Sequence, residues 1–295
     1  MIDMQRLRVL REVAEHGSFS KAAAALLLTP SAVSQQIAAL ERSLGTVVVE
    51  RGARGAVLTE PGRMLVETAD LVLAELRHTQ ERIGRLASGH PDRLTVATFA
   101  SGGQRLLPAA LQRLATKHPG IELTVLEYDP VDSLPLVRAG KADVALAYHF
   151  DGPPPVRKGD RSGLEWTPVM DDPMWIVLPV HHRLADRPTL PLAELSRERW
   201  VHGCLTIGER IDLYAALAGF EIEVACNTTD YVFAQSLIAA GVGVGLVPEV
   251  ALTKRKELVA IELEAPRPSR FIGVITARRR HEHPLVQDLL AALAS

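Results

Sequence analysis

Apolar residues recur every three or four positions in the first 45 residues, which is the spacing of helices that pack on one side. The first stripe consists of Met4, Leu7, Leu10 and Val13, and a glycine-serine pair ends it. An alanine-rich helix is predicted next, over 20–27. The third stripe consists of Val33, Ile37, Leu40 and Leu44. The pattern predicts three short helices in succession.

The start and the outer face of the third helix favour contact with duplex DNA. Thr29 is a good N-cap, and Pro30 suits the first helical position because its missing N–H has no intrahelical partner there. The face opposite the apolar stripe is short and polar, and consists of Ser31, Ser34, Gln35, Ala38 and Arg42. Since these side chains lack bulk, we expect this face to fit the major groove.

A short ribbon is predicted after the third helix. Strand-like runs at 47–49 and 56–58 flank a turn that contains Arg51 and Arg54. Two guanidinium groups at a hairpin tip suit contacts with the minor groove or the phosphate backbone. The first 59 residues therefore predict a winged helix-turn-helix.

A seven-residue apolar repeat follows and predicts one long helix. Its stripe consists of Leu65, Ala69, Val72, Leu76, Thr79, Ile83 and Leu86. Such a repeat is typical of a coiled coil, and a helix of this extent would be about 42 Å long. The seam needs a partner: a second copy of the chain is the favoured interpretation, and packing on the chain's own body is the alternative. Residues 89–92, with a glycine and a proline, predict a hinge.

From residue 93 the pattern changes to short apolar strands that alternate with helices, which predicts a mostly parallel sheet. The predicted strands are 94–98, 122–128, 142–148, 175–178, 200–202, 223–226, 244–247 and 270–276. The predicted helices are 104–117, 133–139, 207–218, 231–240 and 284–294.

Ligands of such sheets bind beyond the carboxyl ends of the strands, near helix N-termini. The candidate effector-binding residues at these positions are Ser101, Gly102, Tyr128, Tyr148, Cys204, Thr206 and Thr229. Hydroxyls and backbone amides dominate this set, which favours a small polar or carboxylate-bearing metabolite. For each hydroxyl taken singly, capping of a helix is an equally good interpretation.

Charge alone does not indicate nucleic acid. The 295 residues carry a net charge of −2, and residues 1–60 carry seven Lys and Arg against six acids, a net of +1. A single N-terminal helix-turn-helix is therefore expected to bind DNA weakly, and two linked copies of it would add their contacts.

Several functional classes are not indicated. There is no signal-peptide pattern and no run of about 20 apolar residues, so we expect a cytoplasmic protein with no membrane partner. The glycines at 241, 243 and 245 follow a helix and open a strand, the reverse of a dinucleotide-binding turn. The histidine pairs lack ligand spacing, and no catalytic constellation stands out, so we expect no metal, no cofactor and no enzymatic activity.

Short motifs in this order resemble the LysR-type transcriptional regulators. In the N-terminal part they are S-F-S-K-A-A at 18–23, S-A-V-S-Q-Q-I at 31–37, L-E-R-S-L-G at 40–45 and L-T-E-P-G at 58–62. Further on they are W-I-V-L-P at 175–179, H-H-R-L-A at 181–185 and G-V-G-V-G-L-V-P at 241–248. The length of the chain is also similar to that of the family.

The resemblance implies an α+β multidomain fold: a winged helix-turn-helix, a long linker helix and a two-lobed α/β effector domain that resembles periplasmic binding proteins. We expect the head at 1–59, the linker helix at 60–88, the hinge at 89–92 and two lobes joined by crossing strands with a ligand cleft between them. The lobes are expected at 93–165 with 268–295, and at 166–267.

The resemblance also implies a sequence-specific regulator of transcription. Its operator contacts would respond to a small-molecule effector, and its homodimers would assemble into a homotetramer. The residues expected to meet base edges are Pro30, Ser31, Ser34 and Gln35. Arg42 is expected to contact phosphate, and Arg51 and Arg54 are expected to contact DNA at the wing.

A rival class is a ligand-binding or catalytic α/β protein in which the N-terminal module only dimerises. Within that class, Cys204 and Cys226 suggest a thiol redox switch, because Cys204 is expected at a helix N-terminus that would lower its pKa. Two ordinary small residues are the alternative interpretation of this pair. Two cysteines are too few for a disulfide framework.

Overall fold

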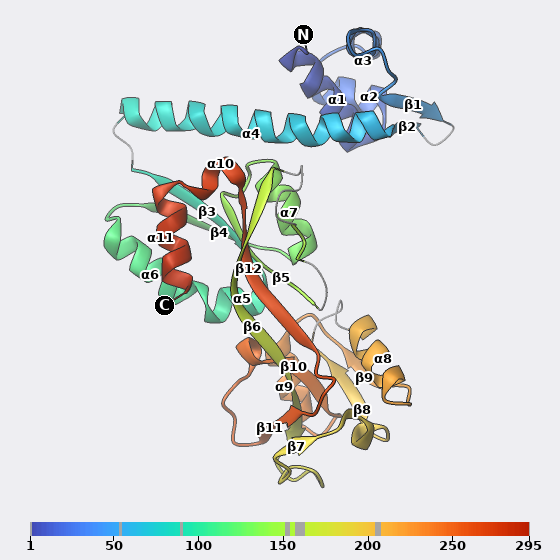
Figure 1. Ribbon diagram of the computed structural model, residues 1–295, viewed down its shortest axis with the longest axis vertical. Helices are drawn as coiled ribbons and strands as arrows, with labels where there is room; N and C mark the ends of the chain where they lie inside the picture. The colour runs from blue at the N-terminus through green and yellow to red at the C-terminus, as the bar shows by residue number, and fades with distance from the viewer. Residues whose placement is uncertain are drawn as a thin grey trace.

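The structure, a computed structural model, describes residues 2–52, 55–88, 91–150, 154–156, 163–203 and 208–294; of Arg51, Arg82, Leu86 and Glu209 it describes the backbone alone. A small head lies at the N-terminal end of one long helix, α4, and an elongated domain of two lobes lies beneath that helix (Figure 1). One lobe lies next to α4 and the other extends away from it.

The head consists of three helices and a ribbon. Their bounds are α1 (Met4–His16), α2 (Phe19–Ala25), α3 (Pro30–Leu44), β1 (Val49–Gly52) and β2 (Gly55–Leu58). The predicted Thr29 cap of α3 is confirmed, since its hydroxyl accepts a hydrogen bond from the Ala32 N–H at 3.2 Å. The ribbon is also confirmed, but it begins two residues later than predicted.

The head has a core of its own. The predicted stripe of α3 is confirmed, because Val33, Ile37 and Leu40 are buried. They pack with the buried face of α1 and with two small residues of α2, Ala22 and Ala23. Burial of these side chains holds α3 with its opposite face outward.

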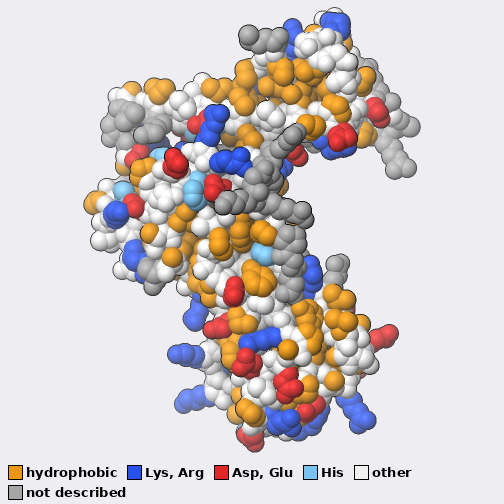
Figure 2. Space-filling view, viewed as in Figure 1, with side chains coloured by type: hydrophobic (Ala, Val, Ile, Leu, Met, Phe, Trp, Pro, Cys, Tyr) orange, Lys and Arg blue, Asp and Glu red, His pale blue; other side chains and the backbone are white. Residues whose placement is uncertain are grey.

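Helix α4 (Glu60–Ser88) has one side that packs against its own chain and another side that is exposed. On one side it packs on its own body: Arg77 donates a hydrogen bond to the Ala139 carbonyl at 2.8 Å, and Arg11 of the head pairs with Asp70 at 3.0 Å. The predicted apolar repeat is divided: Ala69 is buried and Leu65 packs with the head, whereas 38% of Val72 and 48% of Leu76 are exposed on the other side. Hydrophobic side chains gather along α4 and over its junction with the head (Figure 2).

The effector domain alternates strands and helices. Its strands are β3 (Arg93–Thr98), β4 (Glu122–Glu127), β5 (Val144–His149), β6 (Leu164–Pro179), β7 (Thr189–Leu190), β8 (Arg199–His202), β9 (Glu223–Asn227), β10 (Gly245–Pro248), β11 (Leu258–Leu263) and β12 (Ser269–Ala277). Its helices are α5 (Ala100–Arg105), α6 (Leu107–Lys117), α7 (Pro130–Arg138), η1 (Leu192–Leu195), α8 (Gly208–Leu217), α9 (Tyr231–Ala239), η3 (Glu249–Ala251), α10 (Arg278–His281) and α11 (Pro284–Leu293).

The main sheet has eight strands in the order β4-β3-β5-β12-β6-β11-β7, with β10 paired to β6. Strand β3 is parallel to β4 and β5, whereas β12 is antiparallel to β5 and β6. The expectation of a mostly parallel sheet is therefore wrong. The sheet is mixed because β12 returns from the far lobe and runs against its neighbours.

Two long strands join the lobes. β6 and β12 pair along most of the length of β12, and both pass from one lobe into the other (Figure 1). The lobe beside α4 has core residues on both faces of the sheet, and the far lobe has a separate core around Trp200 and Ile176. The cleft described below lies where these two strands cross from one core to the other.

The other predicted elements are confirmed in place, with a few differences. The predicted helix 104–117 is two helices divided at Leu106, and the helix predicted from 133 already begins at Pro130. The strand predicted at 175–178 is only the end of the 16-residue β6. Strands β7 and β11 were not predicted, and residue 207 lies outside the described residues.

Leu27, in the turn between α2 and α3, has a φ of +56° and is 93% exposed. We expect Leu27→Asn to raise the free energy of unfolding by about 1 kcal/mol, because this backbone conformation strains a leucine and Asn adopts it more readily. Urea denaturation measures the change. Leu28→Asn is the matched control, since Leu28 has no positive φ and is more buried; it should lower stability. A similar gain in both variants would contradict the explanation.

Candidate DNA-binding face and effector cleft

The outer face of α3 presents most of the predicted DNA-contact residues. Pro30, Ser31 and Gln35 are exposed around the first turns, and Ser34 is half-buried beside them. Arg42 is exposed in the last turn. The Ser31 and Thr29 hydroxyls are 3.0 Å apart, which orders the start of the helix. Small polar groups at a helix start and a cation near its end match a helix that reads bases and touches phosphate.

The wing is tied to α3 by one carboxylate. Glu41 accepts hydrogen bonds from the backbone N–H groups of Val48 and Val49 at 2.9 and 3.3 Å. Gly62 lets the start of α4 pass close by, since a Cβ there would lie 2.0 Å from the Val48 carbonyl oxygen. The ribbon is therefore held at a set position relative to the outer face of α3.

Two predicted wing residues cannot be placed fully. Arg54 lies outside the described residues, and for Arg51 only the backbone, in β1, is described.

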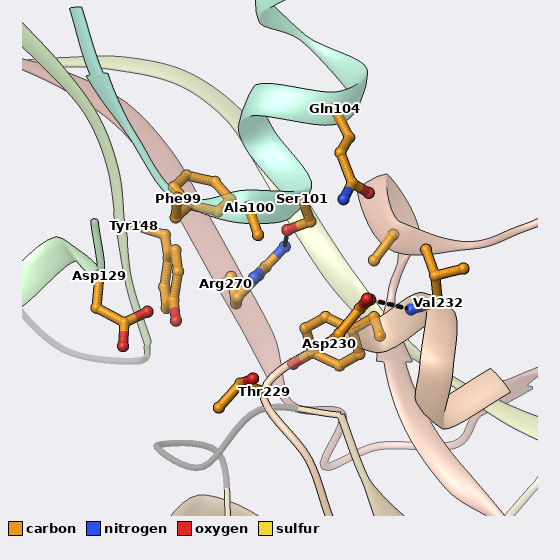
Figure 3. Close-up of a pocket in the computed structure, with 12 residues that line it drawn as sticks. Phe99, Ala100, Ser101, Gln104, Asp129, Tyr148, Thr229, Asp230, Val232 and Arg270 are labelled. Atoms are coloured by element: carbon orange, nitrogen blue, oxygen red, sulfur yellow. Dashed lines mark hydrogen bonds between the residues drawn. The ribbon is translucent and has the colours of Figure 1, made fainter. Parts of the chain in front are cut away.

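A hollow lies between the lobes (Figure 3). From the lobe beside α4 it is lined by Phe99, Ala100, Ser101, Gln104, Asp129 and Tyr148. From the far lobe and the crossing strand it is lined by Thr229, Asp230, Tyr231, Val232, Ala251 and Arg270.

Arg270 forms the floor of this hollow. It stands directly opposite Asp172 in the β12–β6 ladder, and its Nε donates to the Asp172 carboxylate at 2.8 Å. Its Nη2 donates to the same carboxylate and, at 3.2 Å, to the Ser101 hydroxyl. Both members of the pair are almost completely buried. Asp172 also accepts a hydrogen bond from the Val250 N–H at 2.9 Å, so the pair connects α5, both crossing strands and η3.

Aromatic rings surround the guanidinium. The Arg270 Cζ lies 4.5 Å from the ring centre of Tyr148, 5.2 Å from that of Phe99 and 5.8 Å from that of Tyr231. Cation–π attraction of this kind strengthens when water is excluded. Burial raises the pKa of the Asp172 carboxyl above its ordinary value, while the Arg270 charge and the Val250 N–H pull it downward.

The hollow brings together three of the seven candidate effector-binding residues, Ser101, Tyr148 and Thr229. Gly102 packs instead of lining it, because a Cβ there would lie 2.6 Å from the Phe99 ring. Tyr128 is 45% exposed and does not line the hollow. Cys204 and Thr206 lie outside the described residues.

The sequence predictions missed Arg270, Asp172 and Asp129. A usable signal existed for Arg270, since it is a lone charge in the otherwise apolar run of β12. Asp172 and Asp129 gave no such signal, because each lies in a polar stretch next to a proline.

Other candidate chemistry is sparse. Among the residues that the structure describes, no group of three or more His, Cys, Asp or Glu side chains is arranged to hold a metal ion. Cys226 is a free, half-buried cysteine in β9.

Comparison with known proteins agrees with both parts of the chain. A model of the bacterial regulatory helix-turn-helix protein, lysR family, matches residues 4–63, and a model of the LysR substrate binding domain matches residues 87–295. The chain belongs to the LysR family. It is a DNA-binding transcriptional regulator with an effector-binding domain, as the resemblance implied. The rival class, in which the head only dimerises and a thiol pair is the switch, is not favoured.

Similar curated proteins are themselves transcriptional regulators. The LysR-type regulator is 27% identical over 292 residues to the transcriptional dual regulator GltC of Bacillus subtilis, covering 97% of this chain and 95% of GltC. It is 30% identical over 280 residues to a probable hydrogen peroxide-inducible genes activator of Mycobacterium avium, covering 91% of this chain and 86% of that protein.

Solved structures share the fold over the full length. A full-length OxyR variant with one cysteine replaced, from Pseudomonas aeruginosa, aligns with a TM-score of 0.62 at 18% identity, covering 100% of the LysR-type regulator and 98% of that chain. Full-length CbnR in complex with its target DNA aligns with a TM-score of 0.57 at 21% identity, covering 99% of each chain.

Within the described ranges of the regulator, no single helix has the length and apolar character to cross a membrane. Helices α2 and α3 reach that threshold only when joined, and they are bent by 106°. Both belong to the helix-turn-helix.

Asp172→Ala should lower the free energy of unfolding by about 3–5 kcal/mol, because it leaves the buried Arg270 charge without its partner. Urea denaturation followed by circular dichroism measures the loss. The double variant Asp172→Leu/Arg270→Met removes both charges and should lose clearly less. If the double variant is destabilised by as much as Asp172→Ala, an unpaired charge is not the cause.

Proposed function

We propose that this LysR-type regulator reads its operator with the outer face of α3, with Pro30, Ser31, Ser34 and Gln35 facing base edges. The observation that carries this proposal is the outward display of small polar side chains on a helix whose other face is fully packed. Arg42 contacts phosphate, and Arg51 and Arg54 contact the backbone or the minor groove at the wing.

We propose further that the exposed seam of α4 pairs with a second copy. Val72, Leu76 and Ile83 are 38%, 48% and 61% exposed on the face that does not rest on the chain's own body. Three such apolar side chains at heptad spacing would be buried in a helix pair. The near-neutral charge of the head adds to the argument, because a single head binds DNA weakly and a linked pair adds contacts. The family resemblance supports assembly of two dimers into a tetramer, and a cytoplasmic protein.

The lobes are proposed to bind a small polar effector in the hollow around Ser101, Tyr148 and Thr229, with Gly102, Tyr128, Cys204 and Thr206 as further candidates. A carboxylate-bearing metabolite is the prediction from sequence. The Arg270–Asp172 pair supports a role for this site in the relative placement of the two lobes, because its hydrogen bonds connect them. An effector changes operator contacts only if it binds two lobe arrangements with different affinity.

The proposed units of this function are the head at 1–59, the linker helix at 60–88 and the hinge at 89–92. The first lobe comprises 93–165 with 268–295, and the second comprises 166–267. No step of this function requires catalysis.

Gln35→Ala should weaken binding to the operator by about 1–3 kcal/mol and relax its sequence preference, because an amide at a base edge discriminates bases. The DNA upstream of the protein's own gene is the first operator to test, by gel shift against random competitor. Arg42→Ala is the comparison variant: it should weaken all sequences similarly and reduce the salt slope by about 1. Equal losses on operator and random DNA for Gln35→Ala would refute the assignment.

Leu76→Glu should convert the dimer to monomer and weaken operator binding about a hundredfold, because the second head is lost from each binding event. Sedimentation velocity and gel shift measure the two effects. Leu76→Met keeps an apolar side chain of similar volume at the seam and should behave as the unaltered protein. A Leu76→Glu variant that remains dimeric would exclude this seam as the interface.

A further inference from the structure

We propose that the effector carries a cationic nitrogen, which pairs with Asp129, and an acceptor oxygen, which binds Arg270 and Ser101. Its class is a small amine of the amino-acid type, in contrast to a metabolite whose only charge is a carboxylate. This inference rests on the proposed ligand function of the hollow and names the chemistry that the hollow selects.

The acceptor half of the site is the unused part of Arg270. Its Nε and Nη2 donate to Asp172 and Ser101, whereas its Nη1 donates no hydrogen bond within the described part of the chain. Only 2% of the side chain is exposed, yet it lines the hollow. Nη1 is therefore the donor of Arg270 from which a ligand oxygen in the hollow would accept a hydrogen bond.

The charge of Arg270 does not select an anion, because Asp172 already neutralises it at hydrogen-bonding distance. Among the residues that the structure describes, the other charged side chains that line the hollow are Asp129 and Asp230. This described lining carries an excess of negative charge. A ligand with only a carboxylate would be repelled by these groups, whereas a cationic nitrogen would be attracted.

The carboxylates of Asp129 and Asp230 differ in whether they are free to bind a ligand. Asp230 caps α9, where it accepts a hydrogen bond from the Val232 N–H at 2.6 Å. Asp129 is the N-cap residue of α7, but its side chain makes no cap hydrogen bond. Its carboxylate has no hydrogen bond or ion pair with any described residue. Figure 3 shows Asp129 beside Tyr148 on one side of the hollow, with Thr229 and Asp230 on another.

Two backbone amides at the start of α7 are already hydrogen-bonded within the helix. The N–H groups of Asp132 and Ser133 both donate to the Asp129 carbonyl oxygen at 3.0 Å. The first helical residue, Pro130, has no N–H. The charged side chain at this end of α7 that lines the hollow is Asp129, and its carboxylate is the group that an ammonium would meet.

Aromatic rings define the rest of the ligand. The apolar walls of the hollow near Arg270 are the rings of Phe99, Tyr148 and Tyr231. A small ligand that carries an ammonium group and an acceptor oxygen, with an apolar chain against these rings, fits this set of groups.

Three probes with the same five-carbon chain test the proposal on the full-length protein: norvaline carries amine and carboxylate, pentylamine only the amine, and pentanoate only the carboxylate. Their dissociation constants are measured by calorimetry or ligand-observed NMR. We expect both amines to bind more tightly than pentanoate, and norvaline most tightly because it also provides the acceptor oxygen.

Asp129→Asn removes the charge with little change in shape. It should raise the dissociation constants of norvaline and pentylamine about tenfold and leave that of pentanoate unchanged or lower. Asp132→Asn is the matched control, since it removes the same charge from the first turn of the same helix but does not line the hollow. It should leave all three constants unchanged. Thermal unfolding of each variant confirms that it is folded.

Tighter binding of pentanoate than of the amines, or equal effects of Asp129→Asn and Asp132→Asn, would overturn this inference while leaving the hollow as the ligand site. Failure of all three probes to bind would overturn it together with the proposed ligand function. Loss of amine binding in Asp129→Asn alone is the supporting result.

Discussion

The effector domain depends on one desolvated ion pair. Arg270 and Asp172 face each other across the β12–β6 ladder, at the place where these strands leave one lobe and enter the other. Two buried charges are stable only when they lie within hydrogen-bonding distance of each other. Because Arg270 and Asp172 are directly opposite in the β12–β6 ladder, a shift in strand register would separate them. The pair therefore specifies how the two strands align, and through Ser101 and Val250 it also specifies where α5 and η3 lie.

That alignment explains why the hollow forms at this site. The crossing strands form its floor, one lobe contributes Ser101 and Tyr148, and the other contributes Thr229 and Tyr231. The groups that hold the lobes together are thus the groups that a ligand would touch. Binding there would act on the connection between the lobes directly, with no need for a longer path of coupling.

The head was predictable from sequence because its signals are local: the Thr29 cap and the stripe of α3 are set by neighbours in the chain. The crossing strand β6 was not, since prolines and acids interrupt its apolar pattern and only pairing with β12 makes it continuous. For the same reason only part of the hollow was predicted. Hydroxyls after strands could be found from strand order, whereas the Arg270–Asp172 pairing depends on residues 98 positions apart.

Different sides of helix α4 make different contacts: one side packs on the chain's own body, and the other exposes an apolar stripe. Each residue in a helix advances by about 100° and 1.5 Å, so the two sides keep their relation only while the spacing between them is constant. Losing a single residue midway would turn one side away from its surface. Losing seven would keep both orientations and shorten the rod by about 10 Å. Natural length changes in this helix are thus expected in sevens.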